Sequence, residues 1–409
     1  MKAVIVGGKG RMAKPFTQIL SSMEYKVEIL DKEDWKHAKA ILSAAHLVLI
    51  SVPIMYFRTI VEKTCQYISP TALLIDISSI KETPLKTMLY YHQGAVLALH
   101  PMFGPNLTFQ NNKLSTALPL TIVNCGGRYE EKSQYVVDAL TEMRFLIKNM
   151  PAETHDFYTS FIQGLHYFNV FIEGFYFYEK QQKESQLNFS LFEHDKCVTN
   201  LDFLLTNPFS QHAFDELRVM FLDISKAGMY FGILFYELKR VKLYKEFLEI
   251  ADQFLNEQES PTVALDELQK YLNNYKFVKI SWKFQLLDFS QCLHFLLLFF
   301  EATLLLKNDV NLDELRAIST INYNNKLGCI FNIFGNDKGK TLLQSLFDRK
   351  YISEYKKVIK LMRQFIENNL TQELFIATYL QIAPLIKNMS KFCSTKQEIK
   401  TEKSLISKL

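Results

Sequence analysis

The chain has 409 residues, which at roughly 150 residues per domain predicts two to three domains. Its 47 lysine and arginine residues against 43 aspartate and glutamate residues leave a net charge of +4, scattered along the chain. We therefore expect no nucleic-acid partner, because nucleic-acid binding requires a basic stripe. Hydrophobic content of 48% and charged content of 22% exclude a disordered or fibrous protein.

Short apolar runs alternate with helical stretches over residues 1–150. The predicted strands cover residues 3–6, 26–30, 47–52, 72–75, 96–99 and 120–123. Strands that alternate with helices indicate βαβ units and a parallel sheet. We therefore predict one α/β domain over residues 1–150.

A glycine-rich turn follows the first predicted strand. Its sequence, GKGRMA at residues 8–13, has the spacing of a Rossmann dinucleotide-binding fingerprint. Gly8 is expected to make the tight turn and Gly10 to let the backbone approach a pyrophosphate. Arg11 and Met12 lead into a helix whose N-terminus would bind the phosphates. The alternative is a purely structural turn.

Asp31 ends the second predicted strand, 23 residues after Gly8. A carboxylate at this distance accepts a hydrogen bond from the ribose 2′-hydroxyl in dinucleotide sites, and its charge repels a 2′-phosphate. The sequence therefore favours NAD over NADP, although the neighbouring cations Lys32 and Arg11 weaken that preference.

Long apolar helical segments replace the strands after Pro151, and phenylalanine marks the change, because residues 1–150 hold five of the 33 phenylalanines. The predicted helices cover residues 157–178, 214–238, 244–255, 263–272, 284–306, 342–347 and 352–366. The phenylalanines are expected to pack a core rather than to hold an aromatic cofactor. Residues 181–198 are predicted to form a polar connection.

One candidate repeat lies in this helical part. Six residues are matched at a constant offset of 128, namely Gln163, Leu165, His166, Tyr167, Phe171 and Glu173 by Gln291, Leu293, His294, Phe295, Phe299 and Glu301. A tandem duplication would give units at 151–278 and 279–392 and a flexible tail at 393–409. The alternative is a chance likeness between two apolar helices.

Cysteine spacing and hydropathy bear on the compartment. The six cysteines are far apart, with no C-x-x-C pair, so we expect a reducing compartment and no bound metal. The N-terminus lacks the apolar run of a signal peptide. The most apolar stretch, residues 293–306, is shorter than the roughly 18 residues that span a bilayer. A cytoplasmic protein without a membrane partner is expected.

Several segments together resemble the prephenate dehydrogenase family, especially the dehydrogenase part of bacterial enzymes fused to chorismate mutase. The matching stretches are VIVGGKGRM at 4–12, ISVPI at 50–54, DISSIK at 76–81, LHPMFGP at 99–105, and HD at 155–156 followed by FIQGL at 161–165. No segment resembles the mutase. The resemblance implies a Rossmann domain, with Ser51 and Pro53 beside the cofactor, followed by a helical dimerisation domain.

The family's reaction is an NAD-dependent oxidative decarboxylation of prephenate to 4-hydroxyphenylpyruvate, in tyrosine biosynthesis. His100 matches the catalytic histidine, which accepts the proton of the hydroxyl that loses hydride. Ser79 matches the serine that hydrogen-bonds the same hydroxyl. The alternatives are a structural histidine before a proline turn, and an N-cap serine for the following helix.

The expected substrate is a small carboxylic acid, and its binding residues depart from the family. Relatives carry Arg-His where this chain has His166 and Tyr167, and Arg218 is the nearest candidate for a further substrate arginine. The alternative for Arg218 is a solvated helix residue. Because histidine binds carboxylates less well than the bidentate arginine, arogenate, 4-amino-4-deoxyprephenate or another cyclic or hydroxy acid are alternatives to prephenate.

A different class of function is an NAD-binding protein without turnover. The intact glycine turn, Ser79 and His100 argue against it. If the helical part is duplicated, the two units are expected to pack as an internal pseudo-dimer in a monomer. A homodimer is the alternative.

Overall fold

A computed structural model describes most of residues 1–169 and the helices from residue 243 onward. The described residues are 1–105, 107, 109–111, 113–115, 120–128, 131–169, 172, 176, 243–277, 289–319, 321–336 and 338–367. Four predicted features lie outside the described residues: the connection at 181–198, the helix at 214–238, Arg218 within it, and the tail at 393–409. Contacts divide the chain into unit 1, residues 1–162 with 313–320, and unit 2, residues 163–312 with 321–409.

Unit 1 contains a seven-stranded sheet in the order β2-β1-β3-β4-β5-β8-β9. Its strands are β1 (Lys2–Val6), β2 (Lys26–Leu30), β3 (Leu47–Ile50), β4 (Leu73–Asp76), β5 (Val96–Pro101), β8 (Thr121–Arg128) and β9 (Leu146–Asn149). The six predicted strands are confirmed, five of them to within two residues at each end, while β8 continues five residues past its predicted end at residue 123, and β9 is additional. The strand order reverses between β1 and β3, which is where doubly wound sheets bind ligands.

The prediction of a wholly parallel sheet was wrong at one edge. Strand β8 runs antiparallel to β5, with His100 opposite Val123. The described part of the segment between them carries a short hairpin of β6 (Phe109–Gln110) and β7 (Lys113–Leu114) rather than a helix. An antiparallel pair needs no crossover helix, so this connection can return the chain directly.

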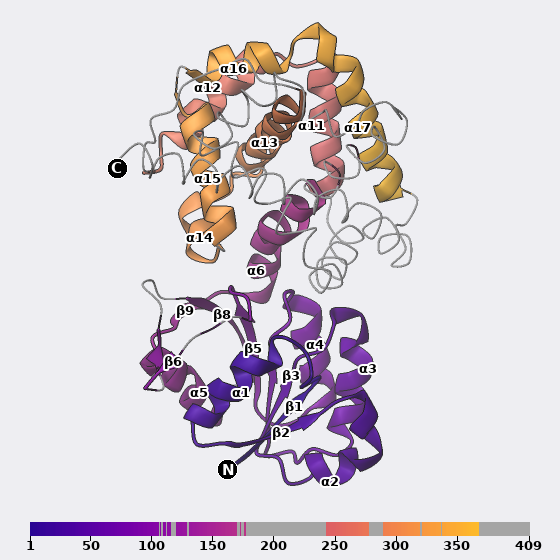
Figure 1. The fold of residues 1–409 in the computed structure, drawn as a ribbon, viewed down its shortest axis with the longest axis vertical. Coiled ribbons are helices and arrows are strands. Elements are labelled where there is room, and N and C mark those ends of the chain that lie inside the picture. The colour runs from indigo at the N-terminus through magenta and orange to yellow at the C-terminus, as the bar shows by residue number, and fades with distance from the viewer. Residues whose placement is uncertain are drawn as a thin grey trace, which may run out of the picture. The chain divides into compact units, whose positions relative to one another are not determined.

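Helices cover both faces of the sheet (Figure 1). The helices of unit 1 that follow its strands are α1 (Ala13–Ser22), α2 (Ala38–Leu42), α3 (Ile54–Cys65), α4 (Glu82–Tyr91) and α5 (Glu131–Glu142), with a 3₁₀ turn at Lys32–His37. Helix α6 (Ala152–Thr159) follows β9 and continues into a π-helical turn at Ser160–Leu165. Figure 1 shows α1 and α5 on one side and α3 and α4 on the other.

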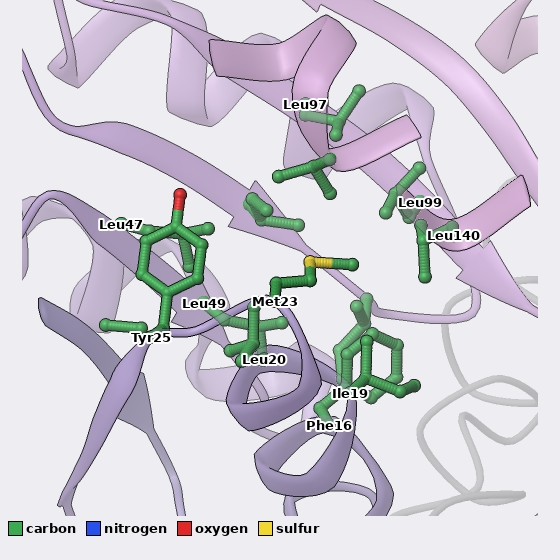
Figure 2. Close-up of a cluster of buried hydrophobic side chains, with 14 of the residues drawn as sticks. Phe16, Ile19, Leu20, Met23, Tyr25, Leu47, Leu49, Leu97, Leu99 and Leu140 are labelled. Atoms are coloured by element: carbon green, nitrogen blue, oxygen red, sulfur yellow. The ribbon is translucent and has the colours of Figure 1, made fainter. Parts of the chain in front are cut away.

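The hydrophobic core between the sheet and helices α1 and α5 shows which side chains of β5 face these helices and which face the opposite side of the sheet. Figure 2 shows Phe16, Ile19 and Leu20 of α1 packed toward the sheet residues Leu97 and Leu99. Because successive side chains of a strand point to opposite faces, β5 turns its alternate positions, including His100, toward the side of α3 and α4.

Unit 2 is built from helices. The described ones in this part of the chain are α11 (Leu243–Leu255), α12 (Pro261–Leu272), α13 (Phe289–Lys307), α15 (Ile321–Phe334), α16 (Lys338–Leu346) and α17 (Arg349–Glu367), while most of α14 (Leu312–Ala317) is assigned to unit 1. Phe254 packs its ring against those of Phe299 and Phe300, at centroid distances of 5.2 and 5.9 Å. The described phenylalanines therefore include a packed core, as predicted.

The first copy of the proposed duplication of the helical part falls largely on residues outside the described ones. Residues 163–169 and α13 are both helical and largely buried, but most of the remainder of the first proposed copy lies outside the described residues. The duplication stays a prediction. None of the described helices combines the length and the apolar character that spanning a lipid bilayer requires.

Candidate functional site

The glycine turn after β1 contains a residue that only glycine can fill. Gly7 has a φ of 81°, and a Cβ there would lie 2.3 Å from the Ser51 carbonyl oxygen. The left-handed turn is thus at Gly7, not at the predicted Gly8. Gly8 is glycine because a Cβ would lie 2.3 Å from Ile29 of β2. Either of two adjacent glycines could adopt the left-handed conformation. Here it is Gly7, the glycine that lies against the Ser51 carbonyl oxygen just after β3.

Helix α1 begins directly after this turn. The Gly10 N–H donates to the Gly7 carbonyl at 2.9 Å, and Ala13 N–H donates to Gly10 at 3.1 Å. Met12 is the N-cap and makes no side-chain capping hydrogen bond, and the first turn carries no acidic residue. Gly10 and Arg11 are exposed and Met12 is half-buried. Such a helix N-terminus, with its positive dipole end, suits a phosphate group.

Asp31 follows β2 and lies against the same turn. Its carboxylate accepts from the Lys9 N–H at 2.9 Å and from the Lys32 N–H at 2.8 Å, and it caps the 3₁₀ turn that follows. Ser51 follows β3 and is half-buried, and Pro53 is the exposed N-cap of α3. The structure therefore brings the predicted cofactor residues to the carboxyl edge formed by β1, β2 and β3.

His100 is buried near the end of β5 and is hydrogen-bonded to a second histidine. Its Nδ1 lies 2.8 Å from Nε2 of His155 on α6, and the two rings meet edge to face with centroids 5.0 Å apart. The Nδ1 of His155 lies 2.8 Å from Oδ1 of Asp156. Residue spacing could not predict this contact, because 55 residues separate the two histidines.

Asp156 also caps α4. Its Oδ1 accepts from Lys81 N–H at 2.7 Å and its Oδ2 from Glu82 N–H at 2.9 Å. The N-cap residue of α4 is Lys81, so the alternative interpretation of Ser79 as the N-cap was wrong. The Asp156 carboxylate of α6 accepts the hydrogen bonds of the first N–H groups of α4 instead. Ser79 lies half-buried in the loop between β4 and α4.

A buried ion pair lies beside these histidines. The Lys81 ammonium contacts the Asp76 carboxylate, and both side chains are fully buried. Lys81 also donates to the Leu99 carbonyl at 2.7 Å, one residue before His100. Sequence reasoning noted the DISSIK stretch that holds both residues but assigned this pair no role.

Both histidines are held in their neutral form. Burial lowers the pKa of His100 well below its ordinary value, helped by the proximity of His155 and Lys81. Burial also lowers the pKa of His155, against the opposing effect of Asp156. A neutral imidazole can accept a proton, which the imidazolium cannot.

The predicted substrate residues His166 and Tyr167 lie in unit 2. His166 is buried, and its Nδ1 lies 2.8 Å from the Lys326 ammonium. Lys326 is paired at 2.6 Å with the fully buried Glu301, so the cation beside His166 is already balanced. Tyr167 is half-buried. Among the described residues, no group of three or more histidine, cysteine, aspartate or glutamate side chains could hold a metal ion.

The strand order, the glycine turn and the uncapped α1 define unit 1 as a Rossmann-type α/β domain. Residues 20–113 match the family model for the nucleotide-binding domain of prephenate dehydrogenase. The T-proteins of Haemophilus influenzae and Enterobacter agglomerans are both 36% identical, over 173 and 184 residues. The N-terminal part of this chain is therefore related to the prephenate dehydrogenase family, and the resemblance noted from the sequence is confirmed.

The curated matches extend over only part of each protein. The alignment with the Haemophilus influenzae T-protein covers 42% of this chain and 44% of that protein, and with the Enterobacter agglomerans T-protein 45% and 47%. The chain thus spans about half the length of the curated relatives it matches. The solved prephenate dehydrogenase from A. aeolicus is 16% identical, with a TM-score of 0.40 over 67% of this chain and 95% of that one.

Proposed function

We propose that the protein is an NAD-dependent dehydrogenase that oxidatively decarboxylates prephenate or a close cyclohexadienyl relative. The observation that carries the proposal is His100, a buried and neutral histidine near the carboxyl end of β5. The glycine turn after β1 and Asp31 after β2 lie at the carboxyl ends of two other strands of the same sheet. The relation to the prephenate dehydrogenase family and the LHPMFGP stretch around His100 support the same reaction.

The residues at the glycine turn fit NAD. The turn has no room for side chains at Gly7 and Gly8, and the N-terminus of α1 offers N–H groups to a pyrophosphate. The Asp31 carboxylate at the end of β2 would accept from a ribose hydroxyl and would repel a 2′-phosphate, which favours NAD over NADP. Ser51 and Pro53 would line the adjacent strand end. When bound, NAD supplies the hydride acceptor.

His100 would hold the proton that the reaction releases. A ring hydroxyl that loses hydride from its carbon becomes a carbonyl, so its proton must pass to a base. His100 is neutral and therefore able to accept it. Ser79, in the loop that follows β4, would hydrogen-bond the same hydroxyl. Loss of the ring carboxylate as CO2 then yields the aromatic product.

A second candidate keeps the NAD chemistry but changes the acid. The pair His166 and Tyr167 replaces the family's Arg-His, and the Lys326 charge beside His166 is balanced by Glu301. Weaker carboxylate binding at this position would favour arogenate, 4-amino-4-deoxyprephenate or another cyclic or hydroxy acid. Arg218 stays a candidate carboxylate ligand.

The test is to incubate the protein with NAD and prephenate and to follow NADH absorbance, with His100→Asn as control. Activity that His100→Asn removes supports the proposal. NAD binding without NADH from prephenate would overturn the prephenate assignment, and a panel of arogenate and related acids would then test the second candidate.

The assembly is a separate proposal. If the two helical segments are duplicates, they would pack as an internal pseudo-dimer and the protein would be a monomer in solution. Light scattering would test this, since a dimer that intertwines through the helical part contradicts it.

A further inference from the structure

We propose that His155 and Asp156 act as positioning residues that hold His100 in the tautomer whose Nε2 is the base. The inference rests on the proposed function, because it concerns the histidine that takes the proton. It is drawn from the direction of three hydrogen bonds around α6 and the end of β5.

The Asp156 carboxylate fixes the first proton. It accepts from the backbone N–H groups of Lys81 and Glu82, at 2.7 and 2.9 Å, and its Oδ1 lies 2.8 Å from the His155 Nδ1. A lone pair on that nitrogen would face the lone pairs of the carboxylate oxygen. The His155 Nδ1 must therefore carry hydrogen and donate.

The second proton follows from the first. His155 is fully buried and neutral, so a hydrogen on Nδ1 leaves its Nε2 with a lone pair. The nitrogen 2.8 Å away, Nδ1 of His100, must then be the donor. Because His100 is also neutral, its Nε2 is the unprotonated nitrogen. The two-histidine chain thus makes Nε2 the basic atom of His100.

The arrangement also supports the protonated state. When His100 takes a proton, its Nδ1–H keeps its acceptor on His155, and the carboxylate of Asp156 lies behind His155 on the same chain of hydrogen bonds. A histidine aligned by a carboxylate through hydrogen bonds is the general device of triad enzymes. Here a second imidazole stands between the carboxylate and the base.

The decisive variant is Asp156→Asn. The amide oxygen would stay where Oδ1 accepts from Lys81 N–H and His155 Nδ1–H, so both tautomers are kept, while the negative charge at the end of the hydrogen-bond chain is lost. The control is Asp138→Asn, the same chemical change on the exposed face of α5. The readout is ¹⁵N NMR of the full chain labelled in histidine, at neutral pH and without substrate, with the His100 signals identified by their loss in His100→Asn.

We expect the Nδ1–H form at His100 and His155 in the wild type and in both variants. We also expect the kcat of Asp156→Asn to fall by about 10–10²-fold, the value of a hydrogen bond to a charged group, with the KM for NAD little changed and the kcat of Asp138→Asn as in the wild type. His100 in the Nε2–H form in the wild type, or an unchanged kcat in Asp156→Asn, would overturn the inference.

The two proposals fail in different ways. If Asp156→Asn does not fold, the wild-type spectrum alone decides the tautomer. If the wild type gives no NADH with any tested acid, the proposed function fails, while the spectrum still tests the hydrogen-bond chain.

Discussion

Replacing Lys81 by Met breaks the buried ion pair behind the histidine site. The Asp76 carboxylate would then remain fully buried and would keep one described donor, the Ser78 N–H at 2.7 Å. Removing one partner of a buried pair costs about 3–5 kcal/mol, because the other charge stays uncompensated. The Leu99 carbonyl also loses a donor. Since whole domains are stable by about 5–15 kcal/mol, we expect a large fall in the free energy of unfolding.

Urea unfolding measures this loss if the signal reports on unit 1 alone. The chain has two tryptophans, Trp35 and Trp282, so a Trp282→Phe background leaves Trp35, after β2, as the fluorescent reporter. The matched control is Lys86→Met, which removes an exposed pair with Glu82 and should cost at most about 0.5 kcal/mol.

A double variant separates charge from packing. Asp76→Asn combined with Lys81→Met removes both charges, and it should recover most of the stability that Lys81→Met loses. The reasoning would be refuted if the free energies of unfolding of Lys81→Met and Lys86→Met differed by less than about 0.5 kcal/mol. It would also be refuted if the double variant were less stable than Lys81→Met.

Three further predictions concern the two strand-end sites. Gly7→Ala should abolish NAD-dependent thermal stabilisation, because its Cβ would meet the Ser51 carbonyl oxygen at 2.3 Å, whereas Gly104→Ala has open space and should behave as wild type. Asp31→Asn should weaken NAD binding by about fivefold, the value of one hydrogen bond, and should strengthen NADP binding; calorimetry measures both. His100 has a lowered folded pKa, so the unfolded chain binds its proton first on acidification. Stability should therefore fall as pH drops below about 6.5, and Tm measured across that range should fall less in His100→Asn; an equal fall would contradict the assignment.

The sheet was predictable because most of its strands are short β-rich runs with strong local patterns. Residues 47–50 are all apolar and buried, whereas residues 26–30 include Lys26 and Glu28 and bury only Leu30, so that strand is recognised from its β-branched residues and its place in the alternation. Strand β9 was missed because only its first two residues, Leu146 and Ile147, are apolar. The direction of β8 depends on the geometry of the connection before it, which no local pattern encodes.

The site was predictable only where its residues are close in sequence. The glycine turn and Asp31 belong to one short motif, although the choice of Gly7 over Gly8 needed the position of the Ser51 carbonyl. The contacts of His155 and Asp156 join residues that are 55 and 75 apart. Such pairings arise from tertiary packing, so they could not be inferred from spacing.

The measurement that tests the central claim most directly is NADH formation from prephenate and NAD by the full chain, compared with His100→Asn. The account predicts NADH formation by the wild type and a loss of about 10²–10⁴-fold in kcat for the variant, with NAD binding retained. Equal rates for the two proteins, or bound NAD without NADH from prephenate or any related acid, would contradict it.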